Sequence, residues 1–450
     1  MNRLIVILAI SAIGLLASFR DAFYGLLLYA FWSFAHPLEL VPWIPLGEYR
    51  LSYIIAVVVI VTAVMQRKKI MLPHRLTFLC ILFLSQCFFS EIEARYFPTY
   101  SEFLLRMLIM TFITSALIEN THKFKMYLVA VTACLGFFGA YYGFTGILFG
   151  NIAVSMQGGS GIIGNCKGDN NHYALWLNMG LPFVWYLGAN LKKAYWRYIF
   201  KVVFIGNIIA VILTFSRAGF LSLVLILPLI FLRKKALFLV IPVIVGISLF
   251  LLMQPLRVSQ PEYIPQEDIA GQTMSLYKQR LGTMSEGPMQ VYTAQARVNF
   301  WKTAIAMANA NPLFGVGFQR HFYEYDRYDV SHGKFGIGRR AIHNTFLSIL
   351  GGTGYPGFLL FILIIFGYFT TLRKSKKLII ENLSGNEKEE FSSYVRMLYI
   401  AMFAFMINGS FVDEPNSEIF WMIIGLVIAL EHIIKNVSLE RAGQEEGSLK

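Results

Sequence analysis

The chain has 450 residues, of which 56% are hydrophobic and only 14% are charged. A soluble protein of this size would leave too much apolar surface in water, so the composition predicts an all-α polytopic integral membrane protein. The apolar runs lack the period-2 alternation of a membrane β-barrel. The net charge of +13 does not indicate nucleic-acid binding, because the basic residues cluster beside apolar segments, as they do at the cytoplasmic ends of membrane helices.

The first eighteen residues resemble a signal peptide. No small-residue cleavage site follows them and further apolar segments do, so we predict an uncleaved helix. The four cysteines lie mostly inside apolar segments, which indicates neither a disulfide framework nor a zinc site.

Apolar segments of helical length recur along the chain and predict about twelve or thirteen transmembrane helices. They fall at residues 4–18, 22–36, 52–66, 76–91, 102–118, 126–149, 172–189, 198–215, 218–232, 236–253, 343–371, 394–411 and 417–435. The two short segments around Arg20 leave the count at the start of the chain open. We expect five parts: N-terminal helices (1–150), central helices with a glycine-rich outer loop (151–253), one large periplasmic loop (254–342), C-terminal helices (343–435) and a polar cytoplasmic tail (436–450).

The basic clusters predict the orientation of these helices. When the segments alternate across the membrane, all the basic clusters fall on one side, and we assign that side to the cytoplasm. The clusters are Lys68-Lys69, Lys192-Lys193, Arg233 to Lys235 and Arg373 to Lys377. The large loop then lies outside, since long loops are translocated largely regardless of charge. Within it, Thr293 to Ala310 has an apolar face and predicts an amphipathic helix that ends at Asn311-Pro312. The polar tail from Asn436 is predicted to be disordered.

Three residues far apart in sequence reach the same outer surface in this topology. Arg217 follows the eighth segment, Arg297 opens the helix of the large loop, and His343 stands at the start of the next long segment. Two guanidiniums suit a phosphate-bearing substrate, because arginine binds phosphate oxygens through a planar fork. Histidine titrates near neutral pH and can accept or donate a proton.

Each of these residues also has a structural interpretation. Arg217 could be a snorkelling anchor, Arg297 could lie on the solvated face of a helix, and His343 could cap a helix. The polar Asn344 and the glycines that follow favour a functional role for His343, because polar groups at membrane depth usually face a site. Arg106, just inside the fifth segment, is a further candidate for the site or an anchor.

The outer loop 151–171 contains two motifs. Gly159, Gly161 and Gly164 form a G-x-G-x-x-G pattern, but no β-strand precedes it, so it predicts a flexible lid and not a dinucleotide site. Asp169 and Asn171 lead into the next segment, where they could cap a helix or bind sugar hydroxyls.

Acidic and histidine side chains elsewhere on the outer side give weaker signals. Asp413 and Glu414 are alternative general bases to His343. The large loop contains a group of acidic and histidine residues: His321, Glu324, Asp326, Asp329 and His332. Their spacing matches no metal-ligand motif, so we predict no metal site.

Together these residues resemble the O-antigen ligase superfamily. The resemblance covers roughly residues 150–430 and rests on the order Arg217, Arg297, His343 and on the pattern His343-Asn344, nine residues, Gly354, two residues, Gly357. Arg297 with Trp301 is similar to the second arginine of the family's large periplasmic loop. The Asp169-Asn170-Asn171 motif is similar to an exosortase-associated branch of O-glycosylation ligases, whereas Gly351-Gly352-Thr353 departs from the acidic pattern of that branch.

The resemblance implies a GT-C-like glycosyltransferase of the bacterial inner membrane that needs no metal or other cofactor. It would move a glycan from undecaprenyl diphosphate to lipid A-core, to protein or to a growing polysaccharide at the periplasmic face. His343, Arg217 and Arg297 would be catalytic, and Asn344, Asp169, Asn171, Trp301 and Arg106 would line the substrate site. A repeat-unit polymerase is the alternative within the family. A lipid-linked glycan transporter is the alternative outside it, although no two-fold repeat of broken helices is visible.

Overall fold

A computed structural model describes residues 2–35, 37, 51–149, 170–214, 216–231, 287–335 and 338–448. These residues form α-helices and no strand, which confirms the predicted all-α class. The helices are α1 (Asn2–Arg20), α2 (Ala22–Ala35), α3 (Leu51–Met65), α4 (Arg75–Glu93), α5 (Thr99–Leu117), α6 (Thr121–Phe149), α9 (Asn170–Ala189), α10 (Ala194–Leu213), α11 (Arg217–Phe231), α14 (Gly287–Ala310), α15 (His321–Tyr328), α16 (Thr345–Asn382), α17 (Gly385–Gly409) and α18 (Glu418–Ser448).

Every predicted apolar segment within the described ranges forms a helix, and segment 236–253 lies outside them. Eight of the helices are long and apolar enough to cross a membrane: α1, α4, α5, α6, α10, α16, α17 and α18. The amphipathic helix expected from Thr293 is α14, which begins earlier, at Gly287. The tail predicted to be disordered from Asn436 is instead helical, because α18 continues through Ser448. The chain is therefore a multi-pass helical membrane protein.

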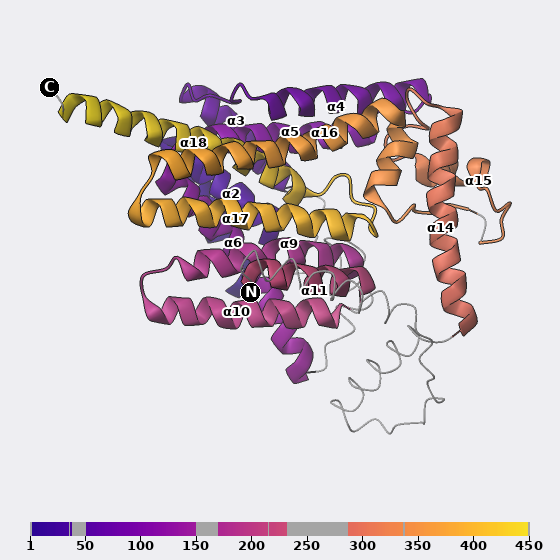
Figure 1. Cartoon of the computed structure of the whole chain (residues 1–450), viewed down its shortest axis with the longest axis horizontal. Helices are drawn as coiled ribbons and strands as arrows, with labels where there is room; N and C mark the ends of the chain where they lie inside the picture. The colour runs from indigo at the N-terminus through magenta and orange to yellow at the C-terminus, as the bar shows by residue number, and fades with distance from the viewer. Residues whose placement is uncertain are drawn as a thin grey trace.

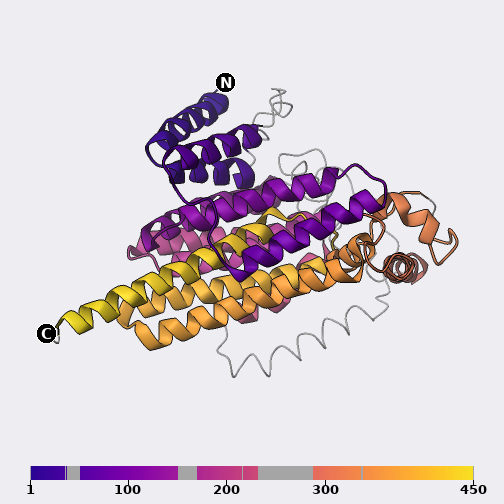
Figure 2. The same cartoon turned by 90° about the horizontal axis from the view of Figure 1, so that it is seen from above.

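The long helices run side by side in one bundle, and α14 crosses one end of it (Figure 1). The C-terminus lies at the other end, at the left of that view. From above, α1, α2 and α3 form a small group that stands beside the main bundle (Figure 2). Only 11% of the α1 span is buried among the described residues.

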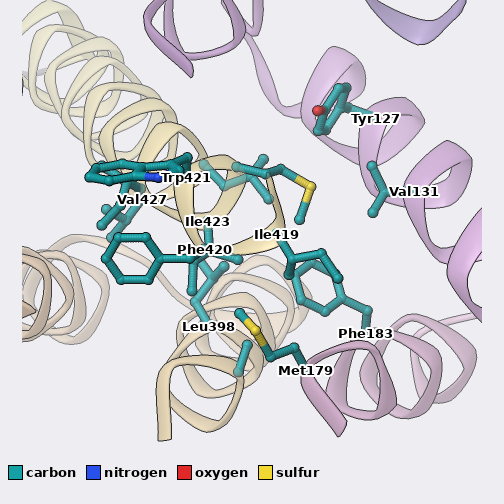
Figure 3. Close-up of a cluster of buried hydrophobic side chains, with 14 of the residues drawn as sticks. Tyr127, Val131, Met179, Phe183, Leu398, Ile419, Phe420, Trp421, Ile423 and Val427 are labelled. Atoms are coloured by element: carbon teal, nitrogen blue, oxygen red, sulfur yellow. The ribbon is translucent and has the colours of Figure 1, made fainter. Parts of the chain in front are cut away.

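The core of the main bundle is built from α6, α9, α17 and α18. Figure 3 shows aromatic and aliphatic side chains from all four helices meeting there, among them Tyr127, Val131, Met179, Phe183, Leu398, Phe420 and Trp421. Lipid tails are as apolar as these side chains, so close packing holds such helices together, more than exclusion from water does. Small residues permit that packing: a Cβ on Gly143 of α6 would lie 2.0 Å from the carbonyl oxygen of Gly206 on α10.

The helix connections gather at two ends, as the alternation predicts. One end carries the turns at residues 66–74, 118–120, 190–193 and 383–384, and we call it the basic end. Contacts across these turns include Lys68 Nζ to Glu119 Oε1 at 2.8 Å and Lys125 Nζ to Glu390 Oε1 at 2.7 Å. The opposite end carries α14, α15 and the first residues of α9, α11 and α16.

Candidate active site

Arg217 is the first residue of α11, and the turn before it is bound to the start of α9. Ser216 Oγ donates to Asn171 Oδ1 at 2.7 Å and accepts from the backbone N–H of Gly219 at 3.0 Å. Asn170 Nδ2 donates to the carbonyl of Thr214 at 2.8 Å. Arg217 therefore stands at a helix N-terminus, where the helix dipole adds to its positive charge and favours an anion.

His343 lies directly before α16 in a left-handed backbone conformation, with φ +54°. Asn344 holds this junction, because its side chain caps the N–H of Leu347 at 3.0 Å and donates to the carbonyl of Ser410 at 3.0 Å. The His343 ring lies 6.1 Å from the ring of Phe300 on α14, centroid to centroid. His343 is thus placed between α14 and the bundle by contacts on both sides.

Arg297 is one turn before Phe300 on α14. Residues three apart are neighbours on a helix surface, and Phe300 is a residue of α14 whose ring contacts His343. Beneath it, a second hydrophobic cluster holds α14 in place: Ala296, Phe300, Ala304, Tyr325, Phe335 and Ile342. Trp301 packs against that cluster. The structure therefore gives Trp301 a packing role beside the site.

The turn between α17 and α18 connects these parts. His321 Nε2 lies 2.6 Å from Asp413 Oδ2, and the next residue, Glu414, forms an ion pair with His172 at the start of α9. Thr345, two residues after His343, accepts a hydrogen bond at its Oγ1 from the backbone N–H of Glu414 at 3.0 Å. The same short turn is therefore linked to both sides of the site. It reaches the Arg217 side through His172, which is next to Asn171, and the His343 side through Thr345.

Two carboxylates of the opposite end have shifted pKa values. Burial by itself raises the pKa of Asp413, but the charge and hydrogen bond of His321 outweigh burial and hold this pKa below its usual value. Burial also raises the pKa of Asp329, while hydrogen bonds from Asn299, Gly333 and Ser331 lower it to about 2. Both groups are therefore ionised at neutral pH. A neighbouring histidine holds Asp413 in place, and a set of hydrogen-bond donors holds Asp329.

The glycine-rich stretch after His343 is a packing seam. The N–H of Val316 donates to the carbonyl of Gly351 at 3.0 Å, and the N–H of Tyr355 donates to the carbonyl of Pro312 at 2.9 Å. A Cβ on Gly315 would lie 2.5 Å from the Gly351 oxygen. In the structure these glycines seat the segment that follows α14.

Of the other predicted substrate-site residues, Arg106 has its contacts on α5 and α3. Arg106 pairs with Glu102 on its own helix, and its guanidinium lies 5.3 Å from the ring centroid of Tyr53 on α3. Asp169 lies outside the described residues. Within the described part of the chain, no group of three or more histidine, cysteine, aspartate or glutamate residues could hold a metal ion.

The sequence offered no signal for the contact between Glu91 and Arg320. Glu91, at the end of α4, is fully buried and accepts from Arg320 Nε at 3.0 Å and from the N–H of Ser101 at 2.8 Å. The guanidinium also lies 4.6 Å from the ring centroid of Tyr96. This contact fixes the start of α15 on the bundle, so it supports the site without belonging to it.

Residues 202–362 match the protein family described as O-antigen ligase. This range begins in α10 and ends within α16, so it includes Arg217, Arg297 and His343. None of the curated proteins compared with the chain matches it. The family match agrees with the helical membrane architecture and with the resemblance that the arginine and histidine motifs predict. The match over residues 202–362 therefore supports the resemblance to the O-antigen ligase superfamily, whose members are membrane ligases and polymerases.

Proposed function

We propose that this protein transfers a glycan from undecaprenyl diphosphate to an acceptor hydroxyl at the periplasmic face of the bacterial inner membrane. The acceptor would be lipid A-core, a protein or a growing polysaccharide. The observation that carries the proposal is the placement of Arg217, Arg297 and His343 at the opposite end of the bundle from the basic turns. Basic turns mark the cytoplasmic side of membrane proteins, so the site would face the periplasm.

In this mechanism Arg217 and Arg297 hold the diphosphate of the donor. As the bond between the sugar and the diphosphate breaks, negative charge grows on the leaving group. Two guanidiniums in place before the reaction would stabilise that charge, and this supports a reaction that needs no metal ion. The N-terminus of α11 would add a further favourable potential at the same position.

In the proposed mechanism, His343 would act on the acceptor. Its imidazole would take the proton from the acceptor hydroxyl as the oxygen attacks the anomeric carbon from the face opposite the diphosphate. Undecaprenyl diphosphate would leave with the electron pair of the broken bond, and the anomeric centre would be inverted. The ring is held between Phe300 and the cap of α16, so it would need little reorganisation before each reaction.

The test is transfer from a fluorescent undecaprenyl-diphosphate glycan by the purified full chain, with EDTA present. Wild type should form product with inverted linkage, and His343→Ala should lose turnover while it still binds donor. His332→Ala is the matched control, because His332 is exposed and has the same backbone conformation, with φ +53°. Donor binding without transfer to any acceptor would favour a transporter, and normal turnover by His343→Ala would remove His343 from the chemistry.

A further inference from the structure

We propose that the hairpin of α9 and α10 binds an anionic phospholipid at the basic end of the bundle. A cavity of about 70 Å³ lies between the end of α9 and the start of α10. Arg197 and Lys201 line one part of the cavity. The rest of the lining is apolar and consists of Val184, Trp185, Gly188, Ala189 and Phe200. A site of this composition suits a lipid whose phosphate meets the two cations. The first methylene groups of the lipid would enter the cavity.

Helical geometry places the two cations together. Arg197 and Lys201 are four residues apart on α10, so they lie one above the other on one face, and Lys193 precedes them by the same spacing. Arginine offers a planar fork for phosphate oxygens and lysine adds a point charge. Basic pockets between membrane helices on the cytoplasmic side are typical sites for phospholipid headgroups.

Within the described residues, no acidic side chain pairs with Arg197 or Lys201 of this hairpin. Residues 170–231 contain no aspartate or glutamate, and neither does α6. Among the ion pairs of the described residues, none includes Arg197 or Lys201, whereas basic side chains at neighbouring turns have acidic partners, such as Lys68 with Glu119 and Lys125 with Glu390. A ligand with negative charge would supply the missing partner.

The surroundings place this cavity at a lipid interface. Only 33% of the α10 span is buried among the described residues, which leaves much of its surface for lipid to cover. Tyr195, Trp196 and Tyr198 are 53%, 44% and 69% exposed beside the basic residues, as in the aromatic belt of a membrane protein. The cavity wall is firm, because the Trp185 ring lies against Phe204 and Phe231 with centroid distances of 5.2 and 4.6 Å. These surroundings favour an occupant from the bilayer.

The experiment is a titration of the purified full chain in detergent with phosphatidylglycerol or with phosphatidylcholine of the same acyl chains, read by native mass spectrometry. Wild type should bind phosphatidylglycerol at least ten-fold more tightly. The double variant Arg197→Gln, Lys201→Gln should lose that preference, because each basic residue near an anionic headgroup contributes about a factor of five. Equal binding of the two lipids by wild type would overturn the proposal.

Two further variants separate a built site from general surface charge. Lys374→Gln with Lys377→Gln removes two exposed charges from the same end of the bundle and should leave the preference intact. Ala189→Phe keeps both cations but places a ring in the cavity, so it should also weaken phosphatidylglycerol binding. An equal loss in the lysine control, or unchanged binding in Ala189→Phe, would show that no such site exists. None of these residues belongs to the proposed transferase site, so the test is independent of it.

Discussion

His321 Nε2 lies 2.6 Å from Asp413 Oδ2, and this contact joins the segment that follows α14 directly to the turn between α17 and α18. The side chain of His321 is only 4% exposed. The next residue, Glu414, reaches His172 at the start of α9. One dipeptide therefore connects the two sides of the proposed site, and its loss should loosen both.

Asp413→Ala should detach α15 from the bundle. Removal of one partner from a buried hydrogen-bonded pair leaves the other unsatisfied and costs about 1–3 kcal/mol. Hydrogen exchange should therefore become faster in α15 and in the residues around Thr345, while α6 and α10 keep their protection. Glu93→Gln, which removes an exposed carboxylate at the same end of the bundle, should change neither. Unchanged exchange in α15 would mean that the Arg320–Glu91 pair alone anchors it.

Asp329 should make the stability of the segment that follows α14 sensitive to acid. Its pKa is about 2 in the folded protein against 3.8 ordinarily. A lowered folded pKa stabilises the fold above pH 3.8, and this contribution is lost as the pH falls from 3.8 towards 2. Hydrogen exchange of residues 321–335 should accelerate in that window in wild type.

The matched variants for this acid effect are Asp329→Asn and Asp326→Asn. Asp329→Asn removes the titrating group, so its exchange should be faster at neutral pH but should depend less on pH below 4. Asp326 is exposed, and Asp326→Asn should follow the wild-type profile. Identical pH profiles for wild type and Asp329→Asn would contradict the assignment.

Arg217→Lys should reduce the rate of glycan transfer by about 10²-fold, because an ammonium cannot reproduce the two-pronged contact with a diphosphate. The effect should fall on kcat, since the charge on the leaving group grows in the transition state. Arg327→Lys is the control, because that side chain is 75% exposed. Full activity in Arg217→Lys would remove its role at the diphosphate.

Gly315→Ala should destabilise the protein more than Gly385→Ala. Both glycines have positive φ, +65° and +56°, so each alanine costs about 1–2 kcal/mol of backbone strain. A Cβ on Gly385 would meet nothing within 4 Å, whereas a Cβ on Gly315 would lie 2.5 Å from the Gly351 oxygen. Thermal unfolding in detergent should separate the two variants, and equal melting temperatures would show that the seam relaxes freely.

Local hydropathy was sufficient to predict the class of the protein, the described membrane helices and the alternation of the basic turns. Each of these depends on residues that are neighbours in the chain, because a helix satisfies its own backbone hydrogen bonds. The order Arg217, Arg297, His343 was also visible in the sequence as motifs. It predicted a common surface for these residues, and the structure places them at one end of the bundle.

The tertiary structure alone decided which polar groups meet. Glu91 pairs with a residue 229 positions away, and Asp413 with one 92 positions away, and no local pattern records such a choice. The glycines after His343 show the same limit: their spacing matched a family signature, and only the structure shows the close approach of Gly315 to Gly351. Sequence periodicity describes which face of a helix is apolar. The partner of a polar group depends instead on how whole helices pack, and side chains from every part of the chain determine that packing.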